Sequence, residues 1–222
     1  MIVGLCEQEE VQAPFVARTV GLSSGYENLR HKVWVGGVDV FFDTEGELRS
    51  FLEKYGEYVY ATEMKSLEEV VGSLLKERGV KLCTAESCTG GLLSARIVNV
   101  AGSSKYFVGG FVVYSNELKT KLLSVDDWVI KEYGAVSEEV CRQMAIGALE
   151  ETDADISLAI TGISGPSGGT ENKPVGLTYI GLATDREVVV KRFYFKGGRN
   201  ENRFMATQWA LEILRKYLLG RL

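Results

Sequence analysis

The chain has 222 residues, 45% of them hydrophobic, and carries a formal net charge of −5. This length and apolar content are enough for one or two domains with buried cores. The negative charge argues against unspecific binding to nucleic acid or anionic lipid, because both need a basic surface.

The N-terminal stretch MIVGLCEQEEVQ contains no basic residue, so we do not expect a signal peptide. No apolar run reaches the roughly 18 residues of a membrane-spanning helix. The four cysteines are scattered and form no C-x-x-C pair: Cys6, Cys83, Cys88 and Cys141. This pattern predicts neither a disulfide framework nor a metal site, and it fits a reducing cytoplasm.

Residues 1–62 are predicted to form a small α/β domain. The stretch HKVWVGGVDVFFDT alternates polar and apolar residues and contains a glycine pair that turns or bulges the strand. The stretch EGELRSFLEKYG predicts a helix with Leu48, Phe51 and Leu52 on one face, ending at Gly56. A domain of roughly 60 residues is only marginally stable alone, and this one shows no polar cluster suited to chemistry.

Residues 63–222 alternate predicted helices and strands. The first helix is capped by Ser66, with Glu69 completing a capping box, and stops at Gly79. The following predicted elements are a strand over 80–85, a helix over 90–102, a strand over 106–115, a helix from Ser137, a strand over 155–161, a hairpin turning at 185–186 and a terminal helix over 200–219. This order predicts a layered α/β/α sandwich with a mixed sheet.

Four polar or glycine-rich stretches follow predicted strands, at residues 84–91, 115–119, 161–173 and 197–203. In layered α/β folds, ligands bind at the carboxyl ends of the strands. The third stretch is a long glycine-rich loop, which is either functional or a flexible connector. The fourth offers Arg199 and Arg203 near a helix start, where an arginine either binds phosphate or is ordinary surface charge.

The stretch from Ser87 to Gly91 joins a strand to a helix and allows three interpretations. Free N–H groups and the positive helix end make it a natural anion site, and glycines let a ligand approach the backbone. Ser87 or Thr89 could instead simply cap the helix. Ser87 could also be a nucleophile, with Glu86 orienting a hydroxyl or stabilising the turn.

A nucleophilic Ser87 needs a base, and the only histidine is His31, which we assign to a turn in the N-terminal part. A Ser-His-Asp triad within the main domain is therefore excluded. Lys119 is the candidate base if burial or a nearby cation lowers its pKa, with Tyr114 relaying or orienting a proton. Taken alone, Lys119 also fits a surface lysine. Cys88 is an alternative nucleophile, because helix N-termini stabilise thiolates.

Three long blocks follow one another in this part: TAESCTGGLLSARIVNVAGSSKYFVGGFVVYSNELKTKLL, YGAVSEEVCRQMAIGAL and AITGISGPSGGTENKPVGLTYIGLA. They resemble, in this order, the C-terminal domain of the competence/damage-inducible CinA family. The resemblance covers roughly residues 67–219. It implies an amidase that hydrolyses nicotinamide mononucleotide to nicotinate mononucleotide and ammonia in pyridine nucleotide salvage.

The resemblance also implies the roles of individual residues. Ser87 would be the nucleophile, and Tyr114 and Lys119 would complete the catalytic set. The implied substrate-binding residues are Glu86, Cys88, Thr89, Gly90, Gly91, Thr161, Gly162, Gly165 and Arg199. The family often has aspartate where this chain has Gly198, which leaves Arg199 available for phosphate. No metal or cofactor is implied, and a homodimer is expected.

Full-length members of that family place a KH-like domain before the deamidase domain, and residues 1–62 resemble a divergent or shortened version of it. The resemblance within these 222 residues does not extend to the large molybdopterin-binding-like first domain of those members, so we do not expect that domain's activities here. Because no GXXG loop with basic flanks is present, we expect a packing or dimerisation module and no nucleic acid. The alternatives are a non-catalytic nucleotide-binding protein linked to competence or DNA damage, an amidohydrolase for another pyridine nucleotide or pterin-like amide, and a thiol enzyme.

Overall fold

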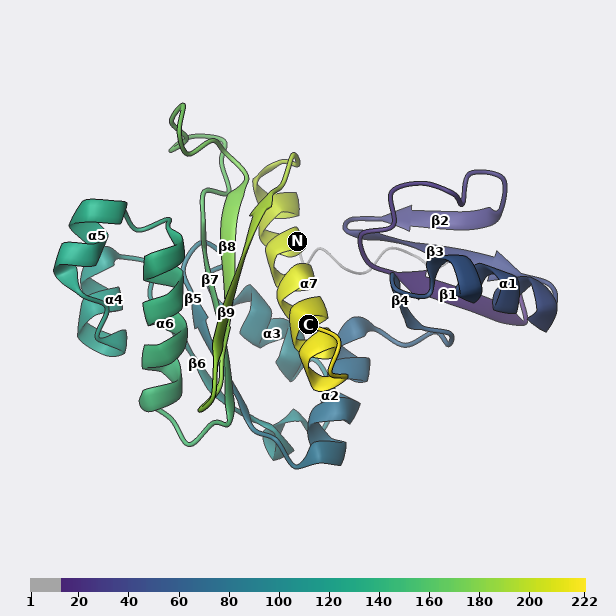
Figure 1. Ribbon diagram of the computed structural model, residues 1–222, viewed down its shortest axis with the longest axis horizontal. Coiled ribbons are helices and arrows are strands. Elements are labelled where there is room, and N and C mark those ends of the chain that lie inside the picture. The colour runs from purple at the N-terminus through teal and green to yellow at the C-terminus, as the bar shows by residue number, and fades with distance from the viewer. Residues whose placement is uncertain (1–12) are drawn as a thin grey trace. The chain divides into compact units, whose positions relative to one another are not determined.

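The structure, a computed structural model, describes residues 13–222 (Figure 1). Cys6 and the acidic N-terminal stretch lie outside the described residues. Two compact units divide between Ser66 and Leu67. Over residues 13–222, no helix combines the length and the apolar character that crossing a membrane requires.

The first unit is a four-stranded antiparallel sheet in the order β2-β3-β1-β4, with one helix. Its elements are β1 (Phe15–Thr19), β2 (Arg30–Trp34), β3 (Gly37–Phe42), α1 (Glu45–Tyr55) and β4 (Val59–Ala61). The predicted turn in the alternating stretch is confirmed, because β2 and β3 form a hairpin around Gly36, whose φ is +94°. The turn assigned to His31 is wrong, since this residue lies in β2.

The helix α1 begins and ends as its sequence predicts. The Thr44 hydroxyl accepts the Glu47 N–H, and the Glu47 carboxylate accepts the Thr44 N–H, so the two residues satisfy each other's first-turn groups. Leu48 and Phe51 are buried, and Gly56 follows the last helical residue.

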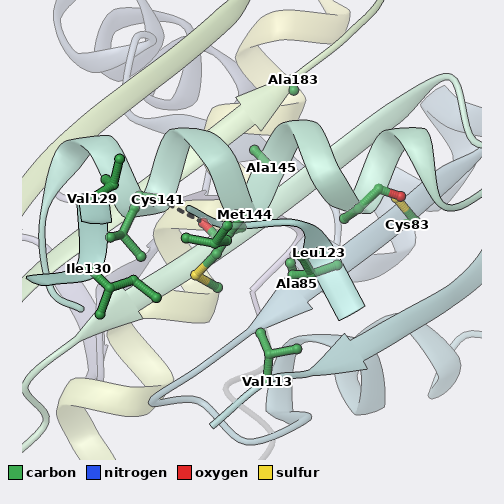
Figure 2. Close-up of a cluster of buried hydrophobic side chains, with 14 residues drawn as sticks. Cys83, Ala85, Val113, Leu123, Val129, Ile130, Cys141, Met144, Ala145 and Ala183 are labelled. Atoms are coloured by element: carbon green, nitrogen blue, oxygen red, sulfur yellow. Dashed lines mark hydrogen bonds between the residues drawn. The ribbon is translucent and has the colours of Figure 1, made fainter. Parts of the chain in front are cut away.

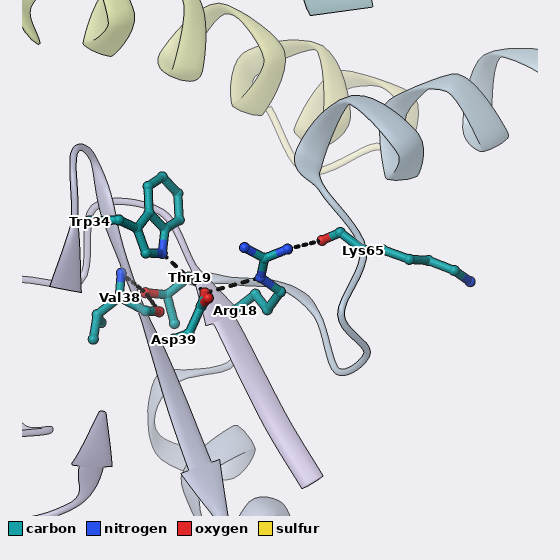
Figure 3. Close-up of polar contacts among 6 residues, drawn as sticks. All are labelled: Arg18, Thr19, Trp34, Val38, Asp39 and Lys65. Atoms are coloured by element: carbon teal, nitrogen blue, oxygen red, sulfur yellow. Dashed lines mark hydrogen bonds and ion pairs between the residues drawn. The ribbon is translucent and has the colours of Figure 1, made fainter. Parts of the chain in front are cut away.

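A buried carboxylate ties the strands of the first unit together (Figure 3). Asp39 is 4% exposed and accepts hydrogen bonds from Arg18 Nε and Trp34 Nε1, each at 3.0 Å. Arg18 also donates to the carbonyl of Lys65 at 2.7 Å. Because each donor comes from a different segment, this cluster joins β1, β2 and β3 to the chain that follows β4.

The second unit is a layered α/β/α sandwich with a mixed sheet, as predicted. Its strands are β5 (Leu82–Glu86), β6 (Phe107–Val112), β7 (Ile156–Gly162), β8 (Leu177–Ala183) and β9 (Val188–Tyr194). They lie in the order β6-β5-β7-β8-β9, with β5 parallel to β6 and β7, and with β8 antiparallel to β7 and β9. The hairpin predicted around residues 185–186 is therefore confirmed.

Helices cover both faces of this sheet (Figure 1). One face carries α4 (Asn116–Leu123), α5 (Asp127–Tyr133) and α6 (Glu138–Glu150). The other carries α3 (Leu92–Val98) and α7 (Arg199–Leu218), with α2 (Leu67–Arg78) packed against both. Ser137 caps α6 through the Val140 N–H, and Gly79 with φ +64° ends α2, as predicted.

One hydrophobic cluster of the second unit lies between the sheet and α4, α5 and α6 (Figure 2). Cys83 and Ala85 of β5 belong to this cluster, together with Met144 of α6. The alternate residues of β5 face the opposite layer, where the Thr84 hydroxyl lies 2.8 Å from the Ser94 hydroxyl of α3. Both layers contain buried polar groups, since on the first face the Ser157 hydroxyl donates to the Ala145 carbonyl of α6 at 2.5 Å.

Arg96 of α3 joins three helices on that second face. It is 5% exposed, and its Nε lies 2.6 Å from the Glu68 carboxylate of α2. Its other nitrogens donate to Thr207 Oγ1 at 2.8 Å and Gln208 Oε1 at 2.6 Å, both on α7. The guanidinium also lies over the ring of Phe204, 4.5 Å from its centroid. Each nitrogen of this buried guanidinium thus has a hydrogen-bond partner, and one face has an aromatic ring.

We expect the substitution Arg96→Met to lower the free energy of unfolding by about 3–5 kcal/mol, because it leaves the Glu68 carboxylate buried without its cation. Equilibrium denaturation measures the change. Arg186→Met is the matched control, since that side chain is 87% exposed, and it should stay within about 0.5 kcal/mol of the wild type. A loss below about 1 kcal/mol in Arg96→Met would show that the cluster is not structural.

The hydroxyl of Tyr106 is buried without a hydrogen-bond partner among the described residues. The residue is 4% exposed, and burial raises the pKa of its phenol. Gly72 of α2 lies opposite, where an added Cβ would stand 2.5 Å from the Tyr106 oxygen. The glycine therefore makes room for the hydroxyl.

We expect Gly72→Ala to destabilise the wild type but to be neutral or stabilising in a Tyr106→Phe background, where the clashing oxygen is gone and alanine favours the helix. The coupling in this double-mutant cycle should be about 1 kcal/mol or more by thermal unfolding. Additive effects would contradict the steric explanation.

Candidate active site

Four strands of the second unit end at the same edge of the sheet. The strands β5, β6 and β7 are parallel to one another. Because β8 is antiparallel to both β7 and β9, β9 runs in the same direction as these three strands. The predicted polar stretches after these strands therefore meet at one edge. Hydrogen bonds from α7 to the carbonyls of Thr89, Ser164 and Gly165 confirm that three of the stretches are in contact.

Ser87 lies in a tight turn between β5 and α3. Its N–H donates to the Ile160 carbonyl at 3.0 Å, and its own carbonyl accepts the Gly90 N–H at 3.1 Å. Gly90 and Gly91 have φ values of +60° and +89°, which other residues rarely adopt. Within residues 13–222, the Ser87 hydroxyl has no hydrogen bond, and the N–H groups of Cys88 and Thr89 have no oxygen acceptor.

The start of α3 is occupied by the carboxylate of Glu86, which is fully buried. This carboxylate accepts the Leu93 N–H at 3.0 Å, the Ser94 N–H at 2.8 Å and the Ser94 hydroxyl at 2.7 Å. The prediction of free N–H groups in the first turn of this helix is therefore wrong for these two. Gly91 stands at the N-cap, so neither Ser87 nor Thr89 caps α3. Both oxygens of the buried Glu86 carboxylate thus accept hydrogen bonds from α3, so this side chain is engaged by the protein itself.

Lys119 is buried on α4, which excludes the surface-lysine alternative. It is 1% exposed, and its Nζ donates to the carbonyls of Val113 at 2.9 Å, Tyr114 at 3.1 Å and Ser115 at 3.4 Å. Burial lowers the pKa of Lys119 to about 8, with the nearby Cys88 opposing the shift. Lys119 and Ser87 are not hydrogen-bonded to each other, so the geometry leaves their contact as a prediction.

Tyr114, Gly165 and Arg199 lie together at the edge of the site. Arg199 Nη1 donates to the Gly165 carbonyl at 2.7 Å, and Nη2 lies 3.4 Å from the Tyr114 hydroxyl. The Tyr114 side chain is 60% exposed, and its carbonyl, not its hydroxyl, contacts Lys119. A proton relay from Lys119 through the Tyr114 hydroxyl therefore has no hydrogen bond to run along in this structure.

Two further residues of α7 contact the site: Asn202, which the sequence did not single out, and Arg203, which it offered as a candidate for binding phosphate. Asn202 is 1% exposed, donates to the Ser164 carbonyl at 3.1 Å and accepts the Gly197 N–H at 2.9 Å. Arg203 Nη2 donates to the Thr89 carbonyl at 2.7 Å. The available signal was their position near the start of a helix that follows a strand. The pattern could not tell which loops they would reach.

Thr161 and Gly162 hold the backbone in place. The Thr161 hydroxyl is buried and donates to the Ala135 carbonyl at 2.8 Å. An added Cβ at Gly162 would lie 2.8 Å from the Thr178 hydroxyl oxygen, so the glycine lets β7 and β8 approach. Lys173, farther along the same loop, donates to the carbonyls of Tyr133 and Val136. The glycine-rich loop is thereby tied to the segment between α5 and α6.

The stabilised thiolate expected at Cys88 is wrong. Burial raises the pKa of this thiol to about 11, although Ser164 and Arg203 oppose the rise. In addition, α3 begins only at Leu92, so Cys88 does not stand at its first turn. Across the part of the chain that the structure describes, no group of three or more His, Cys, Asp or Glu side chains could hold a metal ion.

Comparison with known protein families identifies the family of the second unit. The sequence profile described as "CinA C-terminal domain" matches residues 64–218. The chain belongs to the CinA C-terminal domain family. It is 48% identical over 172 residues to a "Putative competence-damage inducible protein" of Halothermothrix orenii. The aligned region covers 77% of this chain and 42% of that protein. The chain is also 48% identical over 174 residues to a "CinA-like protein" of Thermotoga maritima, covering 78% and 42%.

The chain thus spans less than half the length of these curated relatives. Solved structures of the family are similar to it. A CinA superfamily protein of Klebsiella pneumoniae superposes with a TM-score of 0.67 at 31% identity, over 70% of this chain and 99% of that one. A competence/damage inducible protein of Agrobacterium tumefaciens gives 0.64 at 36% identity, over 69% and 97%.

We expect Lys119 to titrate with a midpoint near pH 8, well below the ordinary value of 10.5. Because the pKa is lower in the folded chain, protonation of Lys119 opposes folding at neutral pH, and this opposition fades as the pH rises from about 8 to 10.5. The Cε resonances of carbon-13-labelled lysine follow the titration, and the Lys119→Arg variant identifies the signal. A midpoint above 10 would contradict the effect of burial.

Proposed function

We propose that the second unit is an amidase that hydrolyses nicotinamide mononucleotide to nicotinate mononucleotide and ammonia, with Ser87 as nucleophile and Lys119 as base. The family resemblance suggests the reaction. The observation that carries the proposal is the buried Lys119, whose lowered pKa makes an amine base accessible near neutral pH. At pH 7, about one tenth of this amine is neutral.

The backbone around β5 supports contact between Lys119 and Ser87. Val113 links the two residues: its N–H donates to the carbonyl of Glu86, the residue before Ser87, at 2.9 Å. The carbonyl of Val113 in turn accepts a hydrogen bond from Lys119 Nζ. Because the Ser87 N–H continues the ladder to β7, strand alternation favours a Ser87 side chain on the face of Cys83 and Ala85. That face is the one covered by α4, which carries Lys119.

The number of protons on Lys119 suggests how the base works. An ammonium has three N–H bonds, which match its three carbonyl partners, whereas a neutral amine has two and a lone pair. The two shorter contacts, to Val113 and Tyr114, can keep the two protons. The third contact, to the Ser115 carbonyl at 3.4 Å, is the longest, so it is the one that Lys119 loses most easily when it becomes neutral. Its direction then becomes free for the Ser87 hydroxyl.

The reaction follows from these groups. Lys119 removes the Ser87 proton as Ser87 Oγ attacks the carboxamide carbon. The N–H groups of Cys88 and Thr89 stabilise the oxyanion, typically by about 3 kcal/mol each, whereas the Gly90 N–H is already bound to Ser87. The protonated Lys119 gives its proton to the departing nitrogen, the C–N bond breaks, and ammonia leaves. Water then attacks the acyl-enzyme, with Lys119 again as base, and frees the carboxylate and Ser87.

The phosphate of the substrate would bind Arg199. This side chain is exposed at the start of α7 and donates only through part of its guanidinium to Gly165 and Tyr114. Guanidinium groups bind phosphate with two parallel hydrogen bonds. The pyridinium charge withdraws electrons from the carboxamide, which favours attack by Ser87.

We expect Ser87→Ala to lower ammonia release from nicotinamide mononucleotide by at least about 1,000-fold without changing the unfolding midpoint. A coupled ammonia assay measures the rate. The control is Ser73→Ala, which alters an exposed serine of α2 and should keep wild-type activity. Binding of the nucleotide by the wild type without ammonia release would instead favour the non-catalytic nucleotide-binding alternative.

A further inference from the structure

We infer that Arg203 is a positioning residue that holds the Ser87 turn in its reactive geometry, while Arg199, one helical turn earlier, serves the substrate. This inference rests on the proposed function. It assigns different tasks to two arginines of α7 that the sequence presents as equivalent, on the basis of what each guanidinium contacts.

The Thr89–Gly90 peptide is bound at both ends. Its carbonyl accepts Arg203 Nη2 at 2.7 Å and the Leu92 N–H at 3.3 Å, and its N–H donates to the Ser87 carbonyl at 3.1 Å. The contact with Arg203 is the shortest of the three and has a charged donor, which makes it the strongest. Fixing this peptide also fixes the two preceding N–H groups, those of Cys88 and Thr89, which have no oxygen acceptor within residues 13–222.

Apart from Arg203, the Thr89–Gly90 peptide is held only by hydrogen bonds to residues of its own turn and of the start of α3. Gly90 and Gly91 both adopt left-handed conformations, and glycine has the largest conformational freedom of any residue. An added Cβ at Gly90 would lie 3.7 Å from Arg203 Nη2, so the guanidinium rests directly against this part of the backbone. Arg203 therefore adds a restraint from α7 to the hydrogen bonds that this glycine-containing turn forms within itself.

The section of α7 that carries Arg203 is held in place by the contacts of its neighbouring residues. The next residue, Phe204, lies beneath the buried Arg96 guanidinium, which also binds Thr207 and Gln208 one turn later. The preceding residue, Asn202, bridges the Ser164 carbonyl and the Gly197 N–H. Arg203 thus extends from a fixed section of α7, and its donor position is set before any ligand binds.

Arg199 differs in each respect. It is exposed, stands at the first residue of α7, and its contacts are the Gly165 carbonyl and the Tyr114 hydroxyl. None of these partners belongs to the Ser87 turn. Loss of Arg199 should therefore weaken substrate binding, whereas loss of Arg203 should disturb the nucleophile and the N–H groups beside it.

The test combines hydrogen–deuterium exchange with steady-state kinetics on the full chain. Four variants are compared with the wild type: Arg203→Met, Arg203→Lys, Arg199→Met and Arg186→Met, the last as the surface control. We expect Arg203→Met to speed amide exchange in the segment 87–92 about tenfold while the segments of β7 and α6 stay unchanged. The same variant should lower kcat for nicotinamide mononucleotide by about 100-fold with KM nearly constant.

Arg203→Lys keeps a cationic donor and should recover most of the exchange protection and part of kcat, whereas Arg199→Met should raise KM and leave exchange in 87–92 unchanged. An Arg203→Met variant that raises KM without faster exchange would overturn the inference and make Arg203 a substrate ligand. If the wild type releases no ammonia, the proposed function fails, and the exchange rates alone still decide whether Arg203 holds the turn. Unchanged exchange in both Arg203 variants would sink the inference.

Discussion

The second unit depends on how one buried carboxylate is satisfied. Glu86 ends β5 with no exposed surface, and a carboxylate there is tolerable only if donors replace its lost water. Two N–H groups and one hydroxyl of α3 supply them, so the strand, the turn and the helix form one hydrogen-bonded junction. Ser87 is the next residue, so this hydrogen-bonded junction fixes its position.

The same edge of the sheet gathers positive charge from separate parts of the chain. Lys119 reaches it from α4, and Arg199 and Arg203 reach it from α7. The three cations are not equivalent, because they differ in burial: Lys119 is enclosed and its pKa is lowered, whereas Arg199 is exposed to solvent. Burial thus separates a group suited to proton transfer from one suited to an anion.

The sequence was sufficient to predict the layer order and the strand ends, because helix caps such as Ser137 and the apolar run of β7 are local signals. It did not predict α4 and α5, whose eight and seven residues give little periodicity and expose Leu118, Leu122 and Trp128. The site was predicted as a set of loops, but the partners of Glu86, Thr161 and Asn202 were not. Those partners are set by the packing of residues far apart in the chain, about which the local sequence pattern carries no information.

The ties on the glycine-rich loop divide it into parts with different freedom. Asn202 and Arg199 hold Ser164 and Gly165 at its beginning, and Lys173 anchors its end to the segment between α5 and α6. Residues 166–169, which precede the two hydrogen bonds between Thr170 and Lys173, are exposed. Changes in chain length, whether natural insertions or an engineered label, therefore have one place in this loop where they leave both anchored ends undisturbed.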